Sequence, residues 1–403
     1  MSPQPERSGN SGRIRYVPTE KEEVQKLQEQ QPERERTFTL SGILLILLVL
    51  VLLFSLFFYM SVETDTFSLS FVVGRVSENV RDFFGFATGT SNHNLINLRV
   101  YRTLIIVLSG MGLAAAGAVY KAIFRNTLAS PDVMGVQSGG NLGNVLFVLL
   151  VADEETVSIA GSSDLIQYSS YIGRNLQGIM IFAACFISVI LLSLVASAAG
   201  RGKMSSSALV LTGTIFSAII GTFVSMIQFQ LIMEDSDSSQ VEIIKNMSLG
   251  TFDYAARLEQ LVTMALIVLP CLLVLRIFAG RMNLYSLGDE EALAMGMNVR
   301  VYKYLMILVS TALVAVVMGY CGHIAFIAFL VPQIARKIGP ADFRSTLVNS
   351  ILIGGILMLV VYDAAAVLKM TDALNVLTTT IGGIVMVVML IGKRGERGAV
   401  ITQ

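Results

Sequence analysis

Residues 280–304 read GRMNLYSLGDEEALAMGMNVRVYKY and form a polar interruption between two long apolar stretches. Ser286-Leu287-Gly288 breaks the preceding helix, and the acidic run that follows opens a short one, because acidic residues favour the positive end of a helix dipole. Gly296 ends this helix within two turns. Such a segment is either an ordinary cytosolic loop or a compact surface that docks into the groove of a partner. Its charged residues are Arg281, Asp289, Glu290, Glu291, Arg300 and Lys303.

The composition of the whole chain is that of a polytopic membrane protein. Of its 403 residues, 54% are apolar and only 14% are charged, whereas soluble domains have about 25% charged residues. The formal net charge of zero argues against a nucleic-acid-binding surface. The three Cys residues lie in apolar stretches and form no CxxC or Cys/His cluster, so neither a disulfide framework nor a metal site is expected.

Hydropathy predicts an all-α fold with about ten transmembrane helices. The eighth of these spans is short and could merge with the seventh as a re-entrant hairpin. The transmembrane domain covers residues 40–395, between a charged tail at 1–39 and a short tail at 396–403. We expect the first tail to be disordered except for a short helix at 19–31. The expected spans are 40–61, 100–120, 132–151, 173–199, 206–232, 258–280, 304–320, 324–338, 347–367 and 374–392.

The distribution of Lys and Arg predicts that both termini are cytosolic. In this orientation 21 of the 29 Lys and Arg residues lie on the inner side, and the number of spans has to be even. Five spans precede the middle of the chain and five follow it. Each half has a Gly-rich span that leads to a polar turn, at 126–132 and at 339–342. These features favour two weakly repeated halves, a common plan among transporters.

Residues 98–143 contain several motifs rich in small residues. Glycines four residues apart fall on one face of a helix, where they let helix backbones touch and leave room beside a central passage. A further block at 319–344 contains a proline within an apolar segment, which kinks a helix. The motifs in 98–143 are Arg99-Val100-Tyr101-Arg102, Arg125-Asn126-Thr127-Leu128-Ala129-Ser130-Pro131 and Gly135-Val136-Gln137-Ser138-Gly139.

Together with the polar stretch at 280–304, these motifs resemble the FecCD/vitamin B12-type permeases, the membrane subunits of ABC importers for iron–siderophore, haem and cobalamin. The resemblance covers about residues 40–395. Three departures stand out: Tyr101 and Thr127 replace proline residues of the family, and Gln333 replaces a histidine. The resemblance implies that residues 281–303 are a cytosolic coupling segment that rests on an ATPase subunit. The residues expected to make this contact are Leu287, Gly288, Asp289, Glu290, Glu291, Ala292 and Gly296.

The resemblance also implies contacts at the opposite face of the membrane. Arg99 and Arg102 would dock acidic residues of an extracytoplasmic substrate-binding protein, because arginine pairs bidentately with carboxylates. Lys369 is the local substitute for a third basic contact, since the turn that the family has there is missing. The candidates for lining the translocation pathway, or for packing its helices, are Gly135, Ser138, Gly139, Gly143, Pro332 and Gln333.

The function that the resemblance implies is that of a permease subunit in an ATP-driven importer of the cytoplasmic membrane. Two permease subunits, identical or different, would enclose the pathway and work by alternating access. An iron–siderophore or a related iron chelate is the expected substrate, with haem and cobalamin as alternatives. The chain has no GxxxxGK[ST] motif, so ATP and Mg²⁺ are expected on the partner ATPase and no cofactor on this chain.

Two functions of other classes remain as alternatives. A secondary transporter driven by an ion gradient would transport without an ATPase, although no ladder of charged residues runs through several spans. An intramembrane enzyme is disfavoured because the sequence shows no Ser/His/Asp or Cys/His arrangement.

Overall fold

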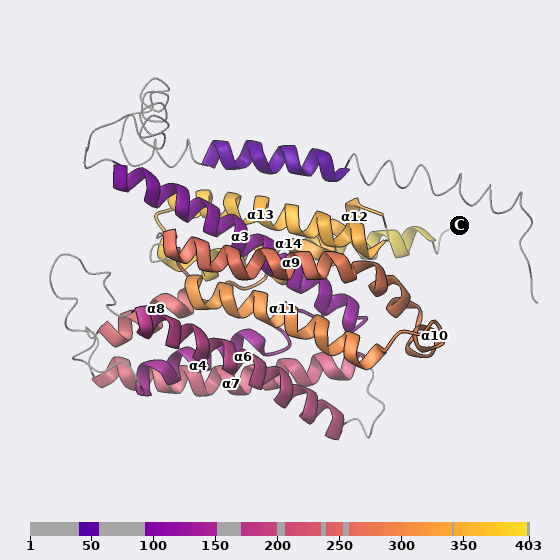
Figure 1. Cartoon of the computed structure of the whole chain (residues 1–403), viewed down its shortest axis with the longest axis horizontal. Coiled ribbons are helices and arrows are strands. Elements are labelled where there is room, and N and C mark those ends of the chain that lie inside the picture. Colours follow the sequence, from indigo (N-terminus) through magenta and orange to yellow (C-terminus); the bar gives the residue numbers. More distant parts are fainter. Residues whose placement is uncertain are drawn as a thin grey trace, which may run out of the picture.

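The computed structural model describes residues 40–55, 93–150, 171–199, 206–234, 239–252, 258–340 and 342–400, and these ranges contain helices, turns and links but no strand. The tail at 1–39, with its expected helix, lies outside them. In Figure 1 the long helices lie side by side, with α10 at one end of the bundle and α8 at the other. The elements are an unlabelled first helix (Leu40–Ser55), α3 (His93–Ile123), α4 (Val136–Leu150), α6 (Tyr171–Ala199), α7 (Ser206–Glu234), α8 (Ser239–Leu249), α9 (Leu258–Leu287), α10 (Asp289–Ala294), α11 (Val299–Cys321), α12 (Ile327–Ile338), α13 (Phe343–Val367), η1 (Thr371–Ala373) and α14 (Leu374–Val400).

The all-α membrane fold expected from hydropathy is confirmed. Among the described helices, 7 are long and apolar enough to cross a membrane. Each expected span contains one helix, but α4 has only 15 residues and α12 only 12. At a rise of about 1.5 Å per residue these two helices are roughly 22 and 18 Å long, which is less than the ~30 Å hydrocarbon core of a bilayer. The eighth span is therefore a half-length helix, as its short apolar run suggested.

Helix α3 is the centre of the bundle. In its span 83% of the residues are buried within the protein, against 17% for α7 and α14. It packs against α9, α11, α12 and α13. Two glycines let neighbouring backbones approach closely: a Cβ on Gly110 would lie 2.2 Å from the carbonyl oxygen of Gly354, and one on Gly117 would lie 1.7 Å from that of Ala328. The Gly- and Ala-rich sequence of α3 thus explains its central place.

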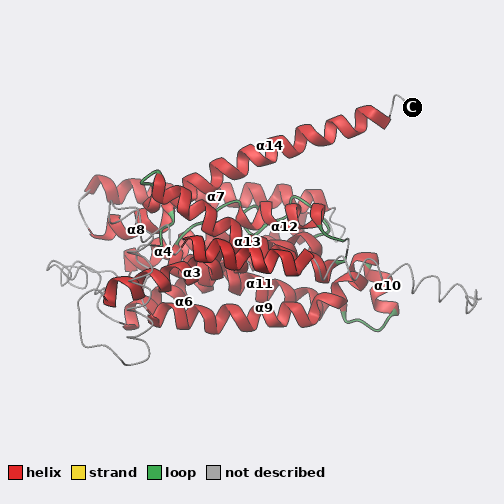
Figure 2. Ribbon diagram, turned by 90° about the horizontal axis from the view of Figure 1, so that it is seen from above, coloured by secondary structure: helices red, strands yellow, loops and turns green. Residues whose placement is uncertain are grey.

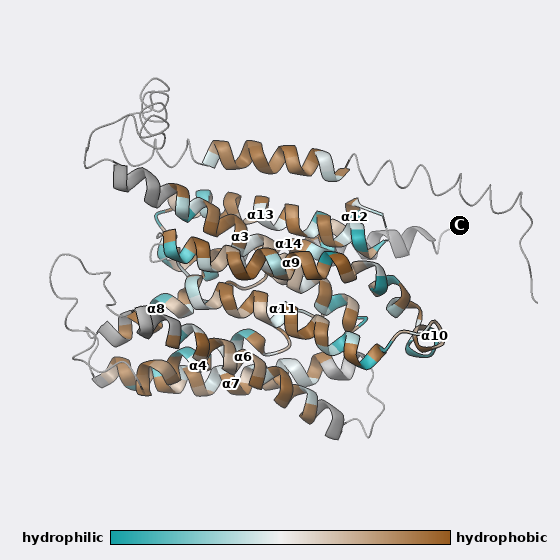
Figure 3. Ribbon diagram, viewed as in Figure 1, coloured by the Kyte–Doolittle hydropathy of each residue, from teal (hydrophilic) through white to brown (hydrophobic). Residues whose placement is uncertain are grey.

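The outer helices present apolar faces to their surroundings. Along α7 the side chains of Ile215, Ile219, Phe223 and Met226 are more than half exposed, at 54%, 52%, 60% and 68%. Figure 3 shows hydrophobic residues along the length of the helices and hydrophilic residues mostly toward their ends. The last turns of α14 diverge from the other helices (Figure 2). Such faces are stable in contact with lipid or with another subunit, but not with water.

The chain twice places a long helix before a short one. Helix α3 is followed by α4, and α11 is followed by α12. The two pairs run in opposite directions, because Arg125, just after α3, bonds to Asp289, which precedes α11. Contacts cross between the pairs, from α3 to α12 and from α4 to α11. The chain thus contains two long–short pairs of opposite orientation, a plan found in many transporters. The two polar turns expected to correspond do not do so, because the turn at 126–132 follows the long helix α3 and the turn at 339–342 follows the short helix α12.

Because α3 approaches α12 closely at Gly117, we expect the stability of the protein to be sensitive to a single methyl group added there. Gly117→Ala should lower the stability by about 1–3 kcal/mol, because the added Cβ overlaps the backbone of α12. Gly221→Ala in α7 is a matched control, since no atom lies within 4 Å of its Cβ position; this change should be neutral or stabilising by up to about 1 kcal/mol. Thermal unfolding in detergent, followed by circular dichroism, measures both. Equal melting temperatures for the two variants would contradict the packing described.

Candidate functional site

The polar stretch that interrupts the apolar sequence forms a projecting turn of helix at one end of the bundle. Helix α9 continues to Leu287, and α10 carries Asp289, Glu290 and Glu291 in its first turn. The chain reverses at Gly296, whose φ of 80° lies in the left-handed region that favours glycine. Asn298 then caps α11 by accepting a hydrogen bond from the backbone N–H of Val301 at 3.2 Å. The short acid-opened helix expected from the sequence is confirmed.

Helix α10 exposes both charges and large apolar side chains. Its three acidic residues are exposed, and Leu287, Leu293 and Met295 are 61%, 58% and 59% exposed. Only Ala292 of the helix is buried. Exposed leucine and methionine next to carboxylates, at the end of a membrane bundle, form a surface suited to contact with another protein.

Arg125 connects α10 to the end of α3. Its guanidinium donates hydrogen bonds to the Asp289 carboxylate and to the carbonyl oxygen of Tyr285, both at 2.5 Å. It also lies over the Tyr285 ring, 4.3 Å from the centroid. The Tyr285 hydroxyl in turn donates to the carbonyl oxygen of Ile123 at 2.9 Å. These contacts join α10 directly to the end of α3 and the segment that follows it.

This segment, residues 124–135, which we call the connector, also holds the start of α12. The carboxylate of Asp132 accepts a hydrogen bond from the backbone N–H of Phe326 at 3.1 Å. In the first turn of α4, Gln137 donates to the carbonyl oxygen of Ile324 at 3.1 Å. Ser217 of α7 donates to the carbonyl oxygens of Asp132 and Val133 at 3.3 Å. The connector thus joins the beginnings of both short helices to α7.

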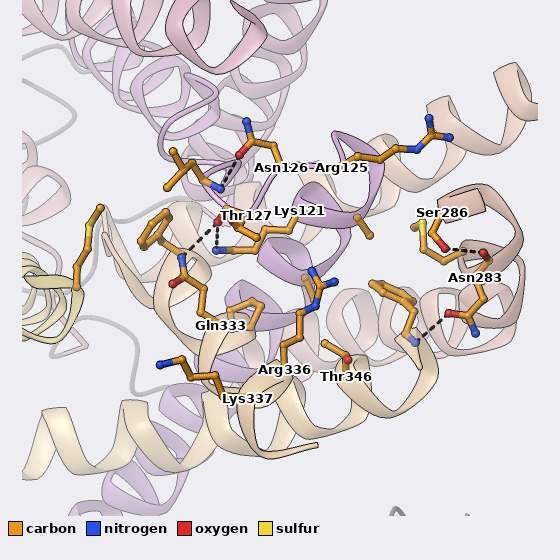
Figure 4. Close-up of a pocket in the computed structure, with 18 residues that line it drawn as sticks. Lys121, Arg125, Asn126, Thr127, Asn283, Ser286, Gln333, Arg336, Lys337 and Thr346 are labelled. Atoms are coloured by element: carbon orange, nitrogen blue, oxygen red, sulfur yellow. Dashed lines mark hydrogen bonds between the residues drawn. The ribbon is translucent and has the colours of Figure 1, made fainter. Parts of the chain in front are cut away.

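A cavity of about 610 Å³ lies beside the connector, lined by residues of α3, α9, α12, α13 and α14 (Figure 4). Figure 4 shows Lys121 and Gln333 pointing toward Thr127 from α3 and α12. Both donate to the carbonyl oxygen of Thr127, at 2.7 and 3.3 Å. Arg336 and Lys337, in the last turn of α12, also line the cavity.

The small residues proposed for the pathway lie mainly between helices. A Cβ on Gly139 would lie 1.9 Å from Oγ of Ser188, and one on Gly143 would lie 2.7 Å from Cβ of Ala184, so both face α6. Gly135, with a φ of 76°, faces the Phe216 ring of α7 at 3.0 Å. Ser138 is half-buried. Pro332 and Gln333, by contrast, both line the inner cavity.

The proposed docking residues share the end of the bundle opposite α10. Arg99 and Arg102 lie near the start of α3, and Lys369 follows α13 directly. Arg102 is half-buried, with one guanidinium nitrogen 3.5 Å from the hydroxyl of Tyr362 on α13. Lys369 is exposed, with a positive φ of 55°.

Sequence analysis missed the structural roles of Arg125 and Asp132. A signal for Asp132 was present, because it is the only acidic residue within 93–150, where the other charged residues are all basic. A single carboxylate in such surroundings has to find a donor or a cation. Among the described residues, no group of three or more His, Cys, Asp or Glu side chains could hold a metal ion.

A sequence profile of the FecCD transport family matches residues 47–392. The chain belongs to the FecCD transport family. It is 30% identical over 329 residues to the hemin transport system permease protein HmuU of Yersinia pestis, covering 81% of this chain and 91% of that protein. It is 26% identical over 304 residues to the vitamin B12 import system permease protein BtuC of Yersinia pseudotuberculosis, covering 74% and 82%.

A solved structure supports the same relationship. It is described as a metal-chelate type ABC transporter in an inward-facing conformation, and it superposes with a TM-score of 0.65 at 25% identity. The superposition covers 87% of this chain and 99% of that one. The FecCD fold therefore extends over the described bundle, including the projecting α10.

The contact between Asp132 and Phe326 can be tested by two substitutions. Asp132→Ala leaves the Phe326 N–H without its acceptor and should destabilise the protein by about 1–3 kcal/mol. Asp132→Asn keeps an acceptor oxygen and should recover most of this loss, apart from about 0.3–1 kcal/mol for the charge at the start of α12. Thermal unfolding of the two variants in detergent measures the difference. An alanine variant as stable as the unchanged protein would rule out this role of Asp132.

Proposed function

We propose that this chain is the membrane-spanning permease subunit of an ATP-driven importer in the cytoplasmic membrane, with both termini in the cytosol. The observation that carries the proposal is α10, an exposed acidic and apolar helix at one end of a FecCD bundle. An ABC ATPase subunit is the partner that fits this surface, and it would bind ATP and Mg²⁺ in place of this chain. Leu287, Gly288, Ala292 and Gly296 would shape the contact that Glu290 and Glu291 make with it.

The substrate class follows from the relatives. Permeases named for hemin, for Fe(3+)-citrate and for vitamin B12 all match the chain, at 30%, 29% and 26% identity. An iron–siderophore or related iron chelate is the substrate that we favour, with haem and cobalamin as alternatives. Arg99 and Arg102, with Lys369, would dock an extracytoplasmic binding protein at the end opposite α10. The exposed apolar face of α7 suits a second permease subunit, identical or different.

The contacts of the connector suggest how ATP binding would reach the membrane. A movement of α10 would pass through the Asp289–Arg125 pair to the connector, and from there to the starts of α4 and α12. The permease would alternate between two states that ATP and the substrate bias in different directions. This arrangement adds Arg125 and Asp132 to the residues involved in coupling.

The role of α10 is tested by reversing its charge. In the Glu290→Lys/Glu291→Lys variant, binding of the ATPase should weaken at least about 100-fold, because like charges across an interface cost several kcal/mol. Glu259→Lys is a matched control, since Glu259 is an exposed acid at the far end of α9. Co-purification of the ATPase and ATP-dependent uptake into liposomes are the measurements. Accumulation of a chelate by this chain alone would identify a secondary transporter and refute the proposal.

The link through Arg125 is tested by separating ATP hydrolysis from transport. The Arg125 and Asp289 side chains are 36% and 58% exposed, so Arg125→Gln should change the stability by less than about 1 kcal/mol. Uptake per ATP hydrolysed should nevertheless fall roughly fivefold or more, as expected for a lost coupling free energy. Arg276→Gln, at an exposed cation of α9 outside the segment 281–303, serves as control. An unchanged ratio of uptake to hydrolysis would exclude Arg125 from the coupling path.

A further inference from the structure

The cavity beside the connector has a strong excess of positive charge. Four cationic side chains line it, from α3, the connector and α12, and no acidic side chain is among its described lining residues. Arg125 is neutralised by Asp289, and Lys121 is held by the Thr127 carbonyl. Arg336 and Lys337 are exposed, and no acidic group of the described chain pairs with them. Two cations thus remain available to a negatively charged ligand.

The rest of the cavity wall is apolar or carries amides. Phe329 lies beneath the Lys121 ammonium, which is 4.2 Å from the ring centroid. Pro332, Met282 and Met386 add apolar surface from three different helices. Gln333 and Asn283 place amide groups at the cavity wall. The volume of about 610 Å³ lies in the range of small-molecule sites, which is about 300–1,000 Å³.

Positive charge at the end of α12 has a simpler explanation, which accounts for only part of the cavity. Basic residues in the last turn favour the helix dipole, and cytosolic ends of spans are rich in Lys and Arg. Both effects also apply to Lys121, which lies in the last turn of α3, but neither explains why cations of two helices converge on one cavity. Nor does either explain the apolar floor that these cations surround. The combination is that of a site for an anion with a partly apolar body.

We propose that this cavity binds the transported chelate in its anionic form on the cytosolic side, before the chelate leaves the permease. The inference rests on the proposed function, because it takes its ligand from the class of iron chelates. Arg336 and Lys337 would contact the negative groups of the chelate, while Phe329, Pro332 and Met386 would contact its apolar parts. A site of this kind gives the permease a preference for anionic chelates that is independent of the binding protein.

The test uses the purified complex of this chain with its ATPase, in nanodiscs of phosphatidylcholine and without the binding protein. Binding of a ferric tricatecholate, which is anionic, is compared by equilibrium dialysis with that of a neutral ferric trihydroxamate of similar size. The tricatecholate should bind at least about tenfold more tightly than the trihydroxamate, because the neutral trihydroxamate cannot make the charge-assisted contacts that the tricatecholate makes. Arg336→Gln/Lys337→Gln should remove this preference, and the control Arg276→Gln, at an exposed cation that does not line the cavity, should keep it. Thermal unfolding verifies that both variants are folded.

Three results would overturn the inference. The first is tricatecholate binding that is the same in all variants, and the second is equally tight binding of the neutral chelate. The third is loss of chelate binding when phosphatidylglycerol is added to the nanodiscs, which would assign the cavity to a lipid head group. ATP-dependent uptake by the same complex with its binding protein is measured in parallel. If uptake persists while the inference fails, the proposed function stands, whereas absent uptake refutes that function whatever the cavity binds.

Discussion

In lipid, the backbone N–H and C=O groups of a chain have to find hydrogen-bond partners within the protein. The rest of this structure depends most on how this requirement is met at the start of α12. Helix α12 has only 12 residues and begins after Phe326, whose φ of 67° lies in the left-handed region. The carboxylate of Asp132 accepts the Phe326 N–H, and the Gln137 amide donates to the nearby Ile324 carbonyl. Two side chains beside the start of α4 thereby stabilise the start of α12. The long helix α3 fits against this junction because Gly117 lets it approach Ala328.

The same junction relates the two ends of the molecule to each other. At the end that carries α10, the acids of this helix are exposed, while Lys121 and Arg336 line the cavity beside the connector. Arg125 lies between these regions and bonds to Asp289. The basic residues proposed for docking, near the start of α3 and just after α13, lie toward the opposite end of the bundle. The surface that we propose for an ATPase and the one that we propose for a binding protein are therefore separated by the length of α3.

Much of the fold could be predicted from the sequence, because hydropathy reports which segments lie in lipid. Every expected span contains a helix, and the acid-opened α10 ends before Gly296 as predicted. Helix ends were less predictable: α9 continues to Leu287 although the apolar run ends near Gly280, and α11 begins at its cap, Asn298. Capping and packing decide these ends, and hydropathy does not detect them. The role of Asp132 depends on a residue 194 positions away, so no local pattern reveals it.

The contact between Gly110 and Gly354 has a consequence for motion. A Cβ added to either glycine would lie within 2.4 Å of the carbonyl oxygen of the other, so the backbones of α3 and α13 touch without intervening side chains. If one helix slid along the other, the larger side chains beside the two glycines would clash at this contact. We therefore expect α3 and α13 to move together as a rigid body. Rearrangement between inward- and outward-open states then falls on loosely held helices at the periphery. Helix α14, with only 17% of its span buried within this chain, lacks such a contact and is the helix that we expect to move against this rigid pair.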